Sequence, residues 1–164
     1  MAIEADPAWL GGRYHPGPGP EAGLAAARAI AMITYRAAPE FEVRFGRART
    51  RRTDAFDIET YLRRQGEKLV ARFDAASYAA LMAVMDAHDM GALDEAARAT
   101  ARRVRQVVGI GIDSDILYPA ADVRRWVEAY APYIDARYEE IASPCGHDAF
   151  LIEFEQVTRI LAGA

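Results

Sequence analysis

The sequence has few of the residues that build several common kinds of active site. Its 164 residues include one cysteine and three histidines, which excludes an internal disulfide and gives no cluster of zinc ligands. A single cysteine fits a reducing cytoplasm. No stretch approaches the roughly 18 apolar residues of a membrane-spanning helix. The acidic start, residues 1–7, lacks the basic and apolar regions of a secretory signal. We therefore expect a cytoplasmic protein without a metal site.

Serine is also scarce, and this bears on nucleophilic catalysis. The serines are Ser77, Ser114 and Ser143, and none has a glycine two residues to either side. The sequence therefore lacks the Gly-x-Ser-x-Gly turn that presents the nucleophile of an α/β-hydrolase.

Composition places the chain among globular proteins. Hydrophobic residues make up 52% and charged residues 27% of the sequence, as in a domain with a sizeable core. The formal net charge of -4 argues against a general electrostatic attraction to nucleic acid or to an anionic membrane.

Hydrophobic periodicity predicts helices first and an α/β pattern afterwards. Residues 1–9 read as the tail of a helix, and 41–52 as a short helix followed by an arginine-rich loop. Helices are predicted at residues 21–36, 58–73, 75–88, 94–103, 121–131 and 148–161, and strands at 107–112 and 136–141. The C-terminal order, strand-helix-strand-helix, is typical of a parallel α/β sheet. Two strands do not complete such a sheet, so we expect a further partner for them.

Asp115 and His147 each follow one of the two predicted strands. The carboxyl ends of parallel strands are where open α/β folds place ligands and catalytic groups. A carboxylate there can fix the imidazole tautomer and stabilise the imidazolium formed in general-base catalysis. On spacing alone, an aspartate and a histidine in such loops are more often structural or solvated than catalytic.

Motifs along the chain resemble, in order, those of the homoserine O-acetyltransferase family. They lie at residues 5–14, 21–25, 33–36, 44–47, 61–68, 72–75, 85–89, 113–119 and 146–151. The resemblance implies the C-terminal part of an α/β-hydrolase fold, with a helical cap over residues 1–93 and the last two strand-helix units of the core over 94–164. It also implies acetyl transfer from acetyl-CoA to the hydroxyl of L-homoserine, toward methionine, through an acyl-serine.

The same resemblance gives candidate site residues. Asp115 and His147 match the acid and base of the catalytic triad, and Arg28, Tyr35 and Asp148 match positions that hold the amino-acid substrate. Arg28 and Tyr35 are spaced by about two helical turns and so share a helix face. A guanidinium suits the substrate carboxylate, and Asp148 suits its ammonium group.

Other reactive or charged residues have plainer interpretations. An arginine cluster fits either contact with the phosphates of coenzyme A or a solvated loop. Cys145 lies too close along the chain to His147 to align as a substitute nucleophile. The arginines of the cluster are Arg44, Arg47, Arg49, Arg51 and Arg52.

The sequence thus predicts a truncated homoserine O-acetyltransferase, inactive alone because the nucleophile is absent. No cofactor is expected to be permanently bound, and acetyl-CoA is the acyl donor. The alternatives are a family member that uses succinyl-CoA or serine, and a non-catalytic or split-gene subunit. The expected partners are a second copy, through the cap helices, or a chain carrying the N-terminal half.

Overall fold

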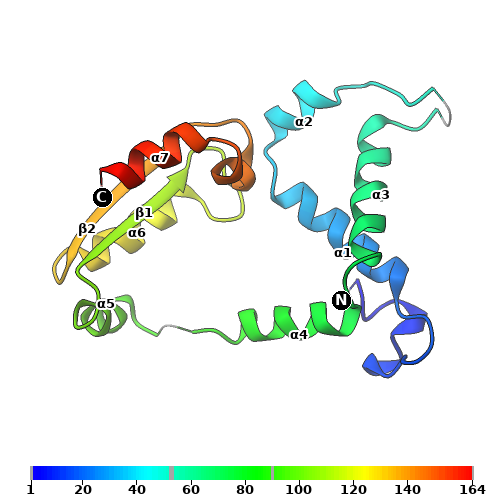
Figure 1. Cartoon of the computed structure of the whole chain (residues 1–164), viewed down its shortest axis with the longest axis horizontal. Helices are drawn as coiled ribbons and strands as arrows, with labels where there is room; N and C mark the ends of the chain where they lie inside the picture. Colours follow the sequence, from blue (N-terminus) through cyan, green and yellow to red (C-terminus); the bar gives the residue numbers. More distant parts are fainter. Residues whose placement is uncertain (1, 52–53, 90, 164) are drawn as a thin grey trace. The chain divides into compact units, whose positions relative to one another are not determined.

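The computed structural model describes residues 2–51, 54–89 and 91–163, and these form two compact units (Figure 1). The first unit comprises the described residues of 1–33 and 43–89. The second comprises residues 34–42 and the described residues from 91 onward. The predicted division into 1–93 and 94–164 differs from these units in two respects: the segment 34–42 packs with the C-terminal unit, and residues 91–93 also belong to that unit.

The first unit is helical. It contains most of α1 (Glu21–Thr34), then α3 (Asp57–Val70) and α4 (Ala75–Asp86), preceded by the 3-10 helix η1 (Pro7–Gly12). Its buried core includes Ile3, Tyr14, Leu24, Leu69 and Ala75.

The helices α1 and α3 cross closely at a glycine. A Cβ atom at Gly66 would stand 2.9 Å from the Cβ of Ala25, which is nearer than carbon atoms pack. Glycine at position 66 therefore sets the spacing of the two helices.

Two N-terminal predictions are wrong in detail. In place of a helix tail, residues 2–6 are turns that lead into η1, and residues 7–9 are its first part. The Asp6 carboxylate accepts hydrogen bonds from the Ala8 N–H (2.9 Å) and the Gly23 N–H (2.7 Å), which ties this segment to the start of α1. The helix predicted from residue 41 is α2 (Ala38–Arg44). It is followed by Gly46 at a φ of 46°, a conformation that favours glycine and ends helices.

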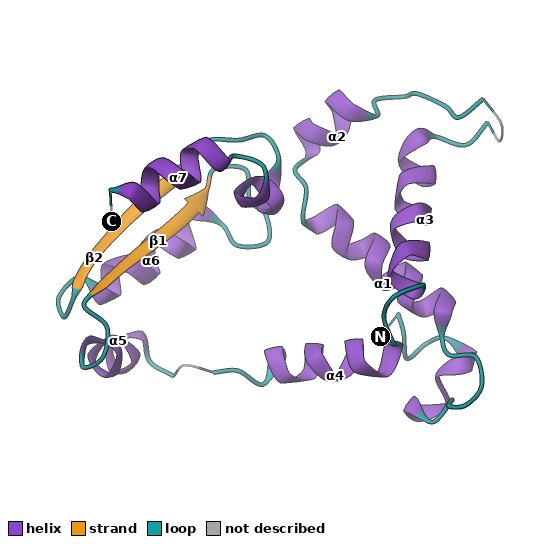
Figure 2. Ribbon diagram, in the orientation of Figure 1, coloured by secondary structure: helices purple, strands orange, loops and turns teal. Residues whose placement is uncertain are grey.

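The second unit is a two-stranded parallel sheet between helices. β1 (Gln106–Ile112) and β2 (Asp135–Ile141) pair in register from Gln106↔Asp135 to Ile112↔Ile141. The helices are α5 (Leu93–Ala101), α6 (Ala120–Tyr130) and α7 (Phe154–Ala162), and α6 and α7 lie on opposite faces of the sheet (Figure 2). The predicted strand-helix-strand-helix order is confirmed.

Alternate residues of β1 explain how the two faces are covered. Val108, Ile110 and Ile112 belong to the core cluster that includes Ile160 of α7. On the other face, a Cβ at Gly109 would stand 2.2 Å from the Val127 side chain of α6. The glycine therefore lets α6 approach the strand.

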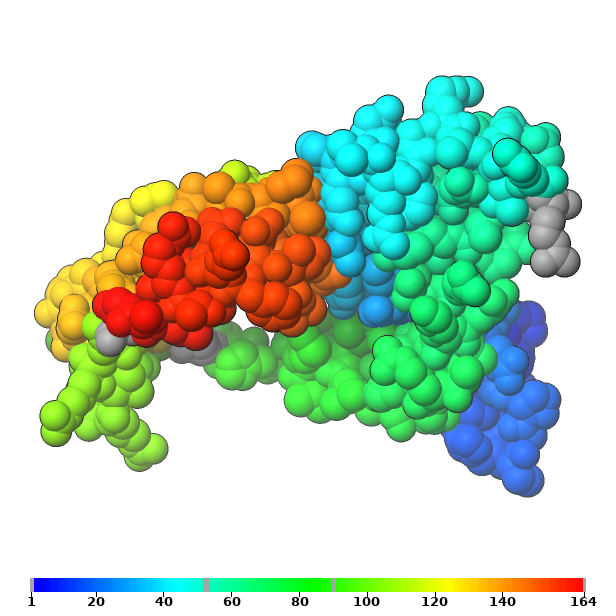
Figure 3. Space-filling view, turned by 45° about the horizontal axis from the view of Figure 1, so that its top comes forward, coloured from blue at the N-terminus to red at the C-terminus, as the bar shows by residue number. Residues whose placement is uncertain are grey.

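The predicted helix 148–161 is two helices. Residues Gly146–Leu151 form the 3-10 helix η2, and α7 begins only at Phe154. Between them Glu153 has a non-helical backbone (φ -85°, ψ 53°), and its carboxylate accepts a hydrogen bond from the Ser143 hydroxyl. This tertiary contact outweighs the local helical pattern. Figure 3 shows α7, in red, at the surface of its unit.

The helices of the described residues are all too short or too polar to cross a bilayer. Within the same residues, no three histidine, cysteine or carboxylate side chains gather as metal ligands.

Candidate active site

Asp115 and His147 form a hydrogen-bonded pair at the carboxyl ends of the two strands. Asp115 lies in the loop after β1, and His147 lies in η2, after β2. The His147 Nδ1 atom is 2.8 Å from Asp115 Oδ2. Parallel, in-register strands place their two following loops side by side, which brings together residues from separate loops.

The two oxygens of Asp115 have different tasks. Oδ1 accepts backbone hydrogen bonds from Leu117 (2.8 Å) and Tyr118 (3.0 Å), and Oδ2 faces His147. The Asp115 side chain is only 4% exposed, whereas that of His147 is 27% exposed. A carboxylate held in this way accepts a hydrogen bond from the Nδ1–H, so Nε2 carries the lone pair that a general base needs.

Aromatic rings surround the imidazole. The ring centroids of Tyr118, Phe150 and Tyr35 lie 5.2 Å, 5.6 Å and 5.9 Å from that of His147. These contacts restrict the rotation of the imidazole about its side-chain bonds.

Two serines tie the loops of the pair to each other. The Ser114 hydroxyl donates to the Ser143 carbonyl and accepts from the Gly146 N–H at 2.9 Å. The Ser143 N–H donates to Asp113 Oδ1 at 3.0 Å, and the Ser143 hydroxyl donates to Glu153 at 2.7 Å. Sequence reasoning missed this network, because a serine beside a strand end gives no signal of its distant partners.

These bonds also bear on the predicted absence of a nucleophile. Ser114 and Ser143 use their hydroxyls to hold loops, and Ser77 lies in the first turn of α4, in the other unit. The Cys145 side chain packs against the core cluster of Ile112 and Ile141. Within the described residues of the second unit, no serine or cysteine is hydrogen-bonded to the His147 ring.

The structure brings Tyr35 and Asp148 beside the pair. The Asp148 N–H donates to the Tyr35 carbonyl at 3.1 Å, and the Asp148 carboxylate lies 3.1 Å from Arg36 Nε. Arg36 was not predicted, since its partner lies far along the chain. Arg28 lies in α1 of the first unit, and its role stays a prediction.

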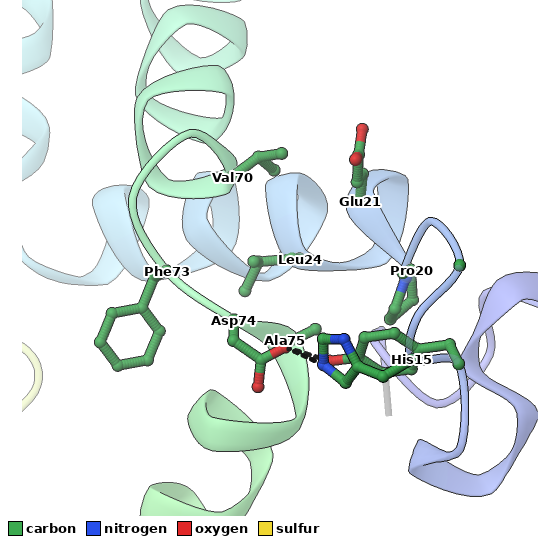
Figure 4. Close-up of a pocket in the computed structure, with 11 residues that line it drawn as sticks. His15, Pro20, Glu21, Leu24, Val70, Phe73, Asp74 and Ala75 are labelled. Carbon is green, nitrogen blue, oxygen red and sulfur yellow. Dashed lines mark hydrogen bonds and ion pairs between the residues drawn. The ribbon is translucent and has the colours of Figure 1, made fainter.

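The first unit contains a second histidine–aspartate pair (Figure 4). His15 Nε2 is 3.2 Å from Asp74 Oδ1, beside a cavity of about 140 Å³. Asp74 also accepts from the Tyr14 hydroxyl (2.5 Å) and caps α4 through the Ser77 N–H (2.7 Å). These two hydrogen bonds lower the pKa of Asp74. Its hydrogen bonds anchor the N-terminal loop to α4, so this pair is structural.

The arginine cluster is partly engaged by its own unit. The Arg44 guanidinium lies 4.7 Å from the Tyr61 ring centroid, and that of Arg49 lies 4.1 Å from the Phe56 ring centroid. Arg49 also pairs with Asp54 at 3.1 Å. Arg52 lies outside the described residues. The predicted contact with coenzyme A phosphates stays a prediction.

Comparison with known proteins shows that the chain is similar to homoserine O-acetyltransferases. Homoserine O-acetyltransferases of Carboxydothermus hydrogenoformans and Chlorobaculum parvum are 43% and 45% identical to the chain over 98% of its length. The chain covers only 45% and 44% of those relatives, so it spans less than half of their length. No protein-family model matches the chain.

Solved structures show the same fold. The crystal structure of homoserine O-acetyltransferase from Bacillus anthracis matches 97% of the chain with a TM-score of 0.83 at 21% sequence identity, over 45% of that protein. An esterase crystal structure matches 97% of the chain with a TM-score of 0.81 at 17% identity. The chain therefore has the fold of the C-terminal part of an α/β-hydrolase, as the family resemblance implied.

Proposed function

We propose that this member of the homoserine O-acetyltransferase family supplies the acid and the base of an acyl transfer. The acyl donor is acetyl-CoA, and the acceptor is the hydroxyl of L-homoserine. The homoserine acceptor and the acetyl group follow the name of the relatives that are 43% and 45% identical to the chain, and acetyl-CoA as the donor is what the family resemblance implies. The free thiol of Cys145 fits the reducing cytoplasm that we propose as its location.

The observation that carries the proposal is the Asp115–His147 geometry. With Nδ1 held at 2.8 Å from the buried carboxylate, Nε2 is the atom that takes a proton from an attacking hydroxyl. The buried, negatively charged Asp115 then stabilises the imidazolium that forms. Asp115 stays ionised throughout, so its part is to orient and to stabilise.

Acyl transfer by this pair needs a nucleophile, and we propose a serine outside these 164 residues. His147 takes the proton of that serine as its oxygen attacks the thioester carbonyl, and the proton passes to the departing thiolate of coenzyme A. In the second half-reaction His147 takes the proton of the homoserine hydroxyl, which attacks the acyl-serine. The proton then returns to the serine as the ester product leaves.

The acceptor is held by charge. In this proposal Arg28 binds the carboxylate of homoserine, Asp148 binds its ammonium group, and the Tyr35 ring lines the space beside His147. A second candidate is a non-catalytic role, as a subunit that completes another chain. It is favoured by the commitment of Ser114 and Ser143 to structural hydrogen bonds.

The proposal is tested by assembly with a serine-bearing segment. The 164-residue chain is mixed with, or fused to, a segment of a homologous homoserine O-acetyltransferase. This segment is the part of the homologue that the 164-residue chain does not cover. We expect acetyl transfer to L-homoserine by the assembly and none by the chain alone. His147→Ala and Asp115→Asn should each lower both half-reactions, by up to about 10⁴-fold in turnover, the scale of losing a triad member.

Burst and steady-state measurements separate the half-reactions, and Thr158→Ala, on the exposed face of α7, is the matched control. Full activity of the assembled His147→Ala variant would reject the role of His147. If the chain alone catalyses acetyl transfer and Cys145→Ala abolishes that activity, the nucleophile is Cys145 and not an external serine. Assembly without any transfer would support the non-catalytic subunit.

A further inference from the structure

Arg36 lies at the centre of a partly buried charge cluster beside the proposed site. It follows α1, in the segment 34–42 that packs with the second unit. Its Nη1 atom donates to Glu40 Oε1 at 2.6 Å, and its Nε atom lies 3.1 Å from Asp148 Oδ2. The side chains of Arg36 and Asp148 are 16% and 19% exposed. Ion pairs at such burial are screened much less than surface pairs.

The backbone around Arg36 contacts the histidine loop on both sides of His147. Before His147, Gly146 has a φ of +67°, and a Cβ there would stand 2.7 Å from Ala37 N and 2.8 Å from the Arg36 carbonyl carbon. After His147, the Asp148 N–H donates to the Tyr35 carbonyl at 3.1 Å. The loop is therefore packed against residues 35–37 with no room for a side chain at position 146.

The imidazole and the Asp148 carboxylate are nevertheless fixed by different groups. His147 is held by Asp115, and its loop by the Ser114 hydroxyl through Gly146. The ion pair with Arg36 is the contact that holds the Asp148 carboxylate within the described residues of this unit. The buried Arg36 Nε has no hydrogen-bond partner within the described residues, so its 3.1 Å contact with Asp148 Oδ2 is an ion pair without a directed hydrogen bond.

We infer that Arg36 is a positioning residue, which holds Asp148 in place to accept the ammonium group of an amino-acid acceptor. The inference rests on the proposed function. Glu40 balances the guanidinium charge, so that Asp148 keeps a net attraction for a cation. Arg36 acts through Asp148 on the binding of the acceptor and leaves the proton transfers at His147 untouched.

The inference predicts a selective kinetic effect of Arg36→Gln in the assembled enzyme. The KM for L-homoserine should rise about tenfold, the scale of one charge-assisted contact. The kcat for hydrolysis of p-nitrophenyl acetate should stay unchanged, since that reaction needs His147 but no ammonium site. Acetyl transfer to 4-hydroxybutyrate, which has the hydroxyl and the carboxylate but no ammonium group, should not respond to the substitution.

Three further variants make this test specific. In an Asp148→Asn background, Arg36→Gln should have no further effect on the KM for L-homoserine, because Arg36 acts through Asp148. Arg36→Lys, which keeps the charge but not the planar fork, should restore part of the loss. Arg124→Gln breaks a more exposed arginine–carboxylate pair of the same unit and should change neither reaction. Equal losses in homoserine transfer and ester hydrolysis would overturn the inference.

A measurement on the 164-residue chain itself separates this inference from the proposed function. In the NMR spectrum, Arg36→Gln should shift the Asp148 carboxyl carbon resonance and speed the hydrogen exchange of the Asp148 amide, while the His147 Nδ1 proton signal persists. An unmoved Asp148 resonance would overturn the inference whether or not the assembly transfers acetyl groups. Absence of any transfer by the wild-type assembly would reject the proposed function alone.

Discussion

The two histidine–aspartate pairs seen among the described residues differ in their surroundings. Asp115 is 4% exposed and lies between two backbone donors and an imidazole, whereas Asp74 is 36% exposed and caps a helix. His147 is packed among three aromatic rings, and His15 is 70% exposed. The same two residue types thus hold an imidazole at the strand ends in one unit and anchor a loop in the other.

The anchoring role of Asp74 predicts a dependence of stability on pH. Hydrogen bonds from the Tyr14 hydroxyl and the Ser77 N–H lower its pKa in the folded state. Its contribution is therefore present above the pKa of an unfolded aspartate, about 4, and is lost as the pH falls below that value. Asp74→Ala should lower the free energy of unfolding by about 1 kcal/mol at pH 7, the typical value of a helix cap.

Urea denaturation at pH 7 and pH 3 checks this, with Asp122→Ala, which removes an exposed carboxylate, as the control. The difference between wild type and Asp74→Ala should shrink at pH 3. A constant difference at both pH values would show that the charge of Asp74 does not stabilise the fold.

At the scale of elements, glycines in β1 set the distance to neighbouring groups. A Cβ at Gly109 would meet Val127 of α6 at 2.2 Å, and one at Gly111 would meet the Tyr138 hydroxyl at 2.3 Å. That hydroxyl donates to Glu140 (2.5 Å), and burial together with this bond raises the pKa of Tyr138 to about 12. The strand is thus built for close approach on the α6 face and for apolar packing on the α7 face.

We expect Gly109→Ala to destabilise the second unit by about 1–3 kcal/mol, the cost of overpacking a core. Gly163→Ala is the matched control, since its Cβ would have 3.6 Å to the nearest atom and should be nearly neutral. Adding Val127→Ala to Gly109→Ala should recover part of the loss, because it removes the clashing methyl groups. Chemical denaturation measures all three, and equal stabilities of the two glycine variants would contradict the described packing.

Local patterns predicted what depends on near neighbours. The apolar run from Val107 to Ile112 is enough to predict β1, and a position after a parallel strand is enough to make Asp115 and His147 candidates. Distant partners explain the failures. The predicted helix 148–161 is interrupted at Glu153, whose carboxylate accepts a hydrogen bond from Ser143. Arg36 forms an ion pair with Asp148, which lies more than 100 residues later in the sequence. Hydrophobic periodicity in a single sequence does not predict contacts between residues that lie so far apart along the chain.

At the scale of the whole molecule, both units expose apolar surface. The helix α4 is apolar on almost all sides, and Leu81, Val84 and Met85 are exposed; helices of this kind are normally covered. In the second unit, β1 and β2 pair only with each other within the described residues, so each has an unpaired edge. Exposed patches and edges of this kind promote association.

We therefore expect the chain to self-associate at micromolar concentration. The pair Leu81→Lys and Val84→Lys should reduce association without unfolding, since both side chains are exposed in α4. Thr158→Lys adds a charge to the exposed face of α7 and serves as the control. Sedimentation velocity over a concentration series measures the effect. A monodisperse wild-type monomer with a cooperative melting transition would contradict the expectation.

Because β1 and β2 pair in parallel, the hydrogen bond between His147 and Asp115 depends on the register of the two strands. The ladder continues past β1 through the Asp113 N–H, which donates to the Ile141 carbonyl at 3.1 Å, and the two loops begin there. One residue of slippage displaces a strand by about 3.3 Å, which is more than the 2.8 Å between His147 and Asp115. The downfield proton resonance expected of this hydrogen bond therefore exists only in the correctly aligned sheet. Its appearance during refolding would time the moment at which the two strands find their register.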